Sequence, residues 1–218
     1  MRAVGLAAAV VAADFAWQFP ANANHQYLQL VCLALLLLLR DEVDAEVGML
    51  AAALRTLLIA GLVYAGLQKA AWGYYFQGEL LAYAVAQFPR FADVLQIALP
   101  ADELARLSRL VVQEGTGPFR VDSALFLVVS NAAWLAELAL PLLLVSRRLR
   151  RLGVVATLVY FLAIEAAARE VFFGGMMAGV ALLFGPPSWL PRALPVFGVA
   201  LVILLATSLG LLPRWFFS

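Results

Sequence analysis

The chain has 218 residues, of which 65% are hydrophobic and 13% are charged, and its net charge is +1. A soluble domain is closer to half apolar and a quarter charged, so this composition predicts an integral membrane protein with little room for a soluble domain. The charge balance gives no indication of nucleic-acid binding. The single cysteine and the single histidine exclude an intrachain disulfide and a multi-histidine metal site.

Apolar segments predict an all-α, polytopic membrane protein with about six transmembrane helices, forming one domain over residues 1–218. In chain order these segments cover residues 3–19, 27–39, 47–69, 122–146, 152–184 and 193–212. The fifth segment is too long for one straight crossing. Since it also contains Gly174-Gly175, we expect a helix, a break or kink, and a second helical piece there.

Residues 79–121 differ from the apolar segments, since their hydrophobic positions alternate with charged ones and prolines interrupt them. This pattern predicts short amphipathic helices that lie on the membrane or cap a cavity. The stretch just before them contains Trp72, Tyr74, Tyr75 and Phe76. Such an aromatic cluster is typical of the boundary between membrane and water.

Basic residues predict the orientation of the chain, because cytoplasmic loops are enriched in arginine and lysine. Four arginines occur within residues 147–151, directly after the fourth apolar segment. We expect this cluster and both termini on the cytoplasmic side of a bacterial inner membrane. Residues 79–121 would then lie on the opposite, extracytoplasmic side.

Lys69 is the sole lysine of a chain that has fourteen arginines. Arginine does not lose its proton in a protein, whereas lysine can do so when it is removed from water. Lys69 is therefore a candidate catalytic base. The alternative is that it anchors the end of its helix at the membrane surface, beside the aromatic cluster.

Further ionisable residues lie within the apolar segments, where charge is costly and marks either a functional site or a buried pair. They are Asp14, Arg55, Glu137, Glu165, Arg169 and Glu170. Arg55 and Glu137 are expected to form a buried ion pair that fixes helix register. Glu165 and Arg169 have the spacing of a salt bridge within one helix. Glu137 and Arg169 are thus expected as members of structural ion pairs, and Asp14 as a hydrogen-bonding residue.

Arg55 and Lys69 are 14 positions apart, which places them about 40° apart around a helix and about 21 Å apart along it. They share a face but cannot touch. Gly66 lies between them, and its small size would let another helix or a flat ring approach closely.

These residues together resemble the transmembrane core, or HTTM domain, of vitamin K-dependent gamma-carboxylases. That family has an Asn-His-x-Tyr-Leu turn, matched by residues 24–28. It also has an arginine followed 14 positions later by the lysine of an Ala-Gly-x-x-Lys helix end. Here the arginine is Arg55 and the helix end is residues 64–69. Glu137 corresponds to an acidic residue of the family, and residues 160–192 also fit. The resemblance covers about residues 22–195.

The resemblance implies that Lys69 deprotonates a bound quinol, either vitamin K hydroquinone or another menaquinol-type quinol, without a metal. Oxygen-dependent epoxidation and the carboxylation of a glutamate, a carbon–carbon lyase reaction, would follow. The residues expected to bind the quinol are Asn24, His25, Arg55, Gly66 and Glu165. Glu165 is a departure from the family, which has a histidine at that position.

Two further hypotheses remain open. The chain could be a catalytically inactive subunit of the same fold that binds another membrane protein or a secreted protein. It could also be a small transporter or quinone-binding module, in which Asp14, Glu137 and Glu165 form a proton path. In every case the lipid bilayer is an expected partner, and nucleic acid is not.

Overall fold

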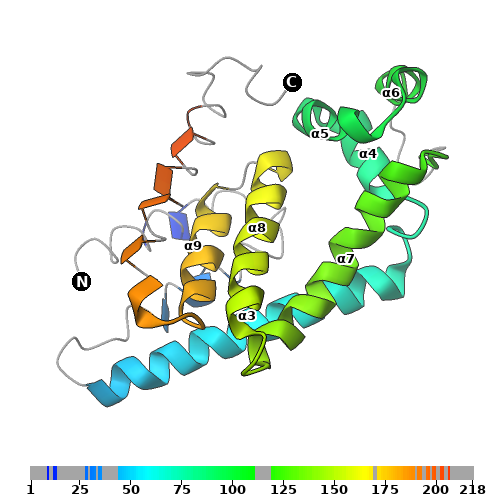
Figure 1. Ribbon diagram of the computed structural model, residues 1–218. Coiled ribbons are helices and arrows are strands. Elements are labelled where there is room, and N and C mark those ends of the chain that lie inside the picture. The colour runs from blue at the N-terminus through cyan, green and yellow to red at the C-terminus, as the bar shows by residue number, and fades with distance from the viewer. Residues whose placement is uncertain are drawn as a thin grey trace.

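The computed structural model describes residues 44–110, 119–168 and 171–189, and in addition a few positions in the flanking segments, among them residues 28 and 30–32. The described parts of the chain contain helices and connecting turns and no strand (Figure 1). The expected all-α fold is therefore confirmed for these residues.

Among the described residues, three helices are long and apolar enough to cross a membrane: α3 (Asp44–Trp72), α7 (Ala124–Val145) and α8 (Arg150–Ala168). The long fifth segment forms two helices as expected, α8 and the shorter α9 (Val171–Leu182). The division is not at Gly174-Gly175, because both glycines lie within α9. The other three expected helices, at 3–19, 27–39 and 193–212, lie largely outside the described residues. The described chain thus shows three candidate crossings, and six crossings stay a prediction.

The long helices pack as one group, in which α3 contacts α7 and α9, and α8 lies between α7 and α9. Figure 1 shows α8 and α9 rising side by side from α3, while α7 leans away from them. Buried apolar residues from all four helices form the core, among them Leu58, Leu62, Leu144, Phe161 and Met177. Gly153 permits the close contact of α7 and α8, because a Cβ atom there would lie 2.8 Å from the carbonyl carbon of Leu143.

The segment between α3 and α7 folds into short helices, as expected for this region. These are α4 (Glu79–Gln87), α5 (Pro89–Leu95), the 3₁₀ turn η1 (Gln96–Ala98) and α6 (Ala101–Ser108). They enclose a second apolar core around Leu107 and Phe126, both of which are fully buried. Gly78 precedes α4 with φ 71°, a left-handed conformation that favours glycine.

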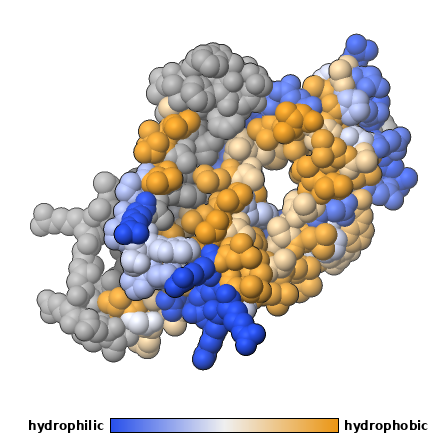
Figure 2. Space-filling view, viewed as in Figure 1, coloured by the Kyte–Doolittle hydropathy of each residue, from blue (hydrophilic) through white to orange (hydrophobic). Residues whose placement is uncertain are grey.

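The outer surface of the long helices is apolar, as lipid contact requires. Leu142 on α7 is 74% exposed, and Val128 and Val159 are also exposed. Figure 2 shows hydrophobic residues over these helices and a strongly hydrophilic projection at the lower end of the view, where the turn between α7 and α8 lies. That turn is flanked by Arg147, Arg148, Arg150 and Arg151, all exposed.

Candidate functional site

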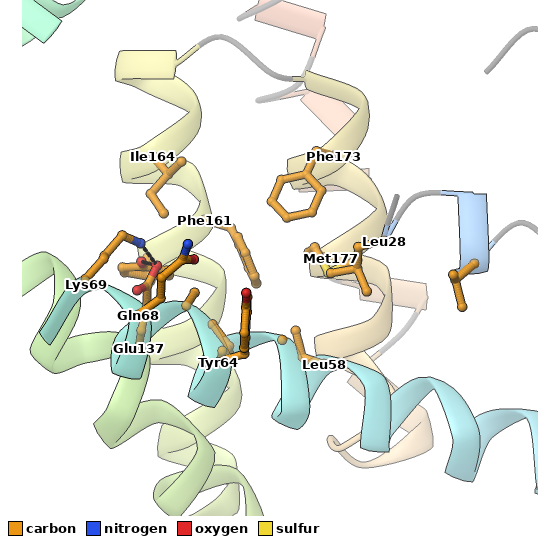
Figure 3. A pocket seen from close by; sticks show the side chains of 15 residues that line it. Leu28, Leu58, Tyr64, Gln68, Lys69, Glu137, Phe161, Ile164, Phe173 and Met177 are labelled. Carbon is orange, nitrogen blue, oxygen red and sulfur yellow. Dashed lines mark hydrogen bonds and ion pairs between the residues drawn. The ribbon is translucent and has the colours of Figure 1, made fainter. Parts of the chain in front are cut away.

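An apolar cavity of about 540 Å³ lies between α3, α8 and α9. Its walls include Leu58, Gly61 and Ala65 from α3, Phe161 and Ile164 from α8, and Phe173 and Met177 from α9. Figure 3 shows Lys69 and Glu137 at one end of this cavity and Leu28 at the other. The cavity therefore has an apolar body and one polar end.

The polar end consists of an ion pair supported by a phenol. Lys69 Nζ donates a hydrogen bond to Glu137 Oε1, and the Tyr160 hydroxyl donates to the same oxygen at 2.6 Å. The Glu137 side chain is 6% exposed and that of Lys69 is 24% exposed. Glu137 Oε2 is buried and has no hydrogen-bond partner among the described residues. This oxygen is consequently available to accept a hydrogen bond from a ligand hydroxyl.

Gly66 explains why Lys69 on α3 reaches Glu137 on α7. A Cβ atom at position 66 would lie 2.7 Å from Leu138 Cδ2 and 3.2 Å from Glu137 Cβ. A side chain at this position would therefore hold the two helices apart. Pro141, inside α7, is four residues after Glu137 and cannot donate the usual backbone hydrogen bond to the Glu137 carbonyl.

The loop after α3 covers the ion pair from the side. Tyr75 is buried there, and its ring centre lies 5.4 Å from Lys69 Nζ. Ser130 on α7 holds the loop by donating to the Tyr75 carbonyl at 2.7 Å. Burial raises the pKa of the Tyr75 phenol above its ordinary range, and the negative charge of Glu137 raises it further.

The aromatic cluster is thus divided between two environments. Trp72 and Tyr74 are exposed and stack with a ring-centre distance of 6.2 Å, as boundary residues can. Tyr75 instead faces the ion pair. Phe76 packs edge-on against Trp134 of α7.

The expected ion pair between Arg55 and Glu137 is wrong. Glu137 pairs with Lys69, whereas Arg55 Nε donates to the Leu183 carbonyl at 2.9 Å, beyond the end of α9. The Arg55 guanidinium also lies 5.8 Å from the ring centre of Phe184. The reason is distance along α3, since Arg55 lies about 21 Å from the turn that faces Glu137.

The other residues expected at a quinol site are in different places. Gly66 packs against α7, and Glu165 is fully buried beside Gly174, where a Cβ atom would lie 2.3 Å from Glu165 Cγ. Neither residue belongs to the described wall of the large cavity, and Arg55 does not either. Asn24, His25, Asp14, Arg169 and Glu170 lie outside the described residues, so the expected Glu165–Arg169 bridge stays a prediction.

The sequence does not predict that Tyr160 and Tyr75 lie at the polar end of the cavity. Tyr160 is 23 positions from Glu137, and nothing in a linear pattern pairs them. Tyr75 resembles the neighbouring boundary aromatics. The informative signals are Gly66, three residues before Lys69, and Pro141, four residues after Glu137, because both mark irregular helix contacts at the site.

Comparison of the chain with protein-family models, with curated proteins and with solved structures finds no match. The resemblance to the carboxylase family therefore rests on the sequence motifs alone.

Proposed function

We propose that this chain is a membrane protein that binds a quinol in the large cavity and removes a proton from a quinol hydroxyl with the Lys69–Glu137 pair. The observation that carries this proposal is the combination of a long apolar cavity with a partly buried ion pair at its end. The resemblance to vitamin K-dependent carboxylases supports the same class of ligand.

The size and lining of the cavity fit such a molecule. Small-ligand pockets usually have volumes of about 300–1,000 Å³ and few polar groups, and a cavity of about 540 Å³ is within that range. Gly61 and Ala65 leave room for a flat ring against α3. Phe161 and Phe173 supply aromatic edges, and the apolar remainder would hold part of an isoprenoid tail.

The ion pair changes the chemical role expected for Lys69. While Nζ is bonded to Glu137 Oε1, the unpaired Oε2 is the first acceptor for the hydroxyl proton. Lys69 then places an ammonium group near the developing oxyanion, which a buried site stabilises strongly. In this proposal the pair acts as the base, and Tyr160 orients the carboxylate through its hydrogen bond.

The test is the binding of a menaquinol analogue to the protein in lipid nanodiscs, measured by quenching of tryptophan fluorescence. Wild-type protein should bind saturably. Lys69→Met should weaken binding about 10-fold to 100-fold, since it removes the ammonium group proposed to lie beside the quinol oxygen, and a hydrogen bond to a charged group contributes about 1.5–3 kcal/mol. Arg55→Met is the matched control on the same helix and should leave the affinity unchanged. Equal affinities for wild type and Lys69→Met would refute the proposed site.

Oxygen uptake in the same preparation tests the reaction that the resemblance implies. Uptake with quinol that is abolished by Lys69→Met would extend the function to quinol epoxidation. Saturable binding without oxygen uptake would instead support the alternative of a binding subunit. The two results separate catalysis from recognition.

The topology proposed with this function places the turn between α7 and α8 in the cytoplasm and the end of α3 that carries Lys69 on the opposite side of the membrane. The course of α7 supports this topology. The segment that follows Lys69 leads into the start of α7 and the arginine-rich turn follows its end, so the two lie at opposite ends of this helix. Cysteines introduced as Gln77→Cys and Arg148→Cys in a Cys32→Ala background test it. An impermeant thiol reagent should label only position 77 in intact spheroplasts.

A further inference from the structure

Lys69 borders two cavities. Besides the large apolar one, a smaller cavity of about 280 Å³ lies at the end of α3. Its walls are Gln68, Lys69, Trp72, Tyr74, Tyr75 and Leu80. Among the described residues, Lys69 is the one ionisable side chain that belongs to both walls, whereas Glu137 belongs to the large cavity alone.

The two cavities lie at different positions along α3. The wall of the small cavity continues beyond the end of α3 at Trp72, which is 64% exposed, to Tyr74 and Leu80, which are also exposed. The large cavity extends back along α3 to Leu58, about 21 Å before that end. The small cavity therefore lies at the rim of the spanning region, and the large one lies within it.

The two members of the ion pair also differ in solvent exposure, and the more exposed one is the residue that borders the small cavity. The Lys69 side chain is four times as exposed as that of Glu137, at 24% against 6%. The charged and titratable groups that face Lys69 are Glu137 from α7, Tyr160 beyond the carboxylate on α8, and Tyr75 from the loop. Lys69 is thus the member of the pair that faces outward.

From this arrangement we infer that the small cavity is a water-filled proton route and that Lys69 is the group that passes protons between it and the large cavity. The inference rests on the proposed function. The quinol O–H bond breaks and its proton binds Glu137 Oε2, leaving the oxyanion. The Lys69 ammonium releases a proton to water in the small cavity. The neutral amine then takes the proton from the Glu137 carboxylic acid, which restores the pair.

Water access is tested by the reaction of a cysteine at position 69 with a small, charged methanethiosulfonate reagent, using Lys69→Cys in a Cys32→Ala background. The reagent should modify this thiol, and Leu80→Phe, which fills the small cavity, should slow modification by about tenfold or more. Ala65→Phe, which fills the large cavity, should not slow it. If Lys69→Cys folds poorly, Gln68→Cys is the alternative probe, because it leaves the ion pair intact. Its thiol should show the same dependence on Leu80→Phe and Ala65→Phe.

The opposite pattern, with access blocked by Ala65→Phe and unaffected by Leu80→Phe, would overturn the route. Access through neither cavity would overturn it as well. This experiment needs no quinol, so its result does not depend on whether the proposed function holds.

Proton transfer is tested by adding quinol to the protein with a membrane-impermeant pH indicator outside the vesicles. Wild-type protein should release a proton when quinol binds, and Leu80→Phe should slow that release about tenfold or more with unchanged quinol affinity. Leu67→Phe, at an exposed position of α3 that borders neither cavity, should leave the rate unchanged. Unchanged release in Leu80→Phe would contradict the route, whereas absence of quinol binding in wild type would contradict the proposed function instead.

Discussion

Gly66 on α3 lies directly against Glu137 on α7, and a Cβ atom at position 66 would come within 3.2 Å of Glu137 Cβ. This contact determines how close α3 and α7 can lie. The ion pair at the end of the cavity depends on that closeness, because Lys69 is one helical turn further along α3.

Gly66→Ala should therefore lower stability by about 1–3 kcal/mol, the usual cost of adding atoms to a packed interface. Thermal unfolding in detergent measures this. The control is Gly48→Ala on the same helix, where an added Cβ would meet nothing within 4 Å. Helix propensity makes Gly48→Ala neutral or stabilising by up to about 1 kcal/mol. A similar loss in both variants would show that the close helix contact is not the cause.

The Lys69–Glu137 pair predicts energetic coupling between the two positions. In a double-mutant cycle with Lys69→Met and Glu137→Gln, the coupling energy should be about 1–3 kcal/mol, because Lys69→Met leaves the buried Glu137 carboxylate without its cation. The cycle of Arg55→Met with Glu137→Gln should be additive. Coupling in the second cycle and none in the first would instead support the ion pair between Arg55 and Glu137 that the sequence suggested.

Tyr160 donates to the carboxylate of Glu137, so Tyr160→Phe removes a hydrogen bond to a charged group. The expected loss of stability is about 1.5–3 kcal/mol. Tyr74→Phe removes a hydroxyl from an exposed ring and should change stability by no more than about 0.5 kcal/mol. Chemical unfolding of the two variants under identical conditions makes the comparison, and indistinguishable midpoints would count against the role of Tyr160.

The Tyr75 phenol should ionise at higher pH than exposed tyrosines, because burial and the Glu137 charge raise its pKa. The unfolded chain then loses this proton first, so Tyr75 contributes stability below about pH 10 that declines as pH rises further. Ultraviolet titration of folded protein should accordingly give the same curve for wild type and Tyr75→Phe up to about pH 11. A smaller phenolate signal in Tyr75→Phe below that pH would show that Tyr75 is solvated.

Much of the helical architecture is predictable from sequence, because length and apolar composition determine where a chain can cross a membrane. This holds for α3, α7 and α8 and for the division of the fifth segment into α8 and α9. The amphipathic character of residues 79–108 likewise predicts short helices. The sequence also marks Lys69, since it is the sole lysine.

The partner of Lys69 is not predictable in the same way. Glu137 is 68 positions away, and the choice between Lys69 and Arg55 depends on which turn of α3 contacts α7. That contact is determined by packing around Gly66, which a helical periodicity does not report. Tyr75 differs from its aromatic neighbours for a similar reason, because the hydrogen bond from Ser130 fixes the loop and turns this ring inward.

The most direct measurement is the structure of the protein in nanodiscs with a menaquinol analogue, which retains the ring hydroxyls, bound. We predict that the ring lies in the cavity between α3, α8 and α9, with one oxygen within hydrogen-bond distance of Glu137 Oε2 or Lys69 Nζ and the tail directed toward Leu28. A ring bound elsewhere, with the Lys69–Glu137 pair unchanged and the cavity filled by lipid, would contradict the account.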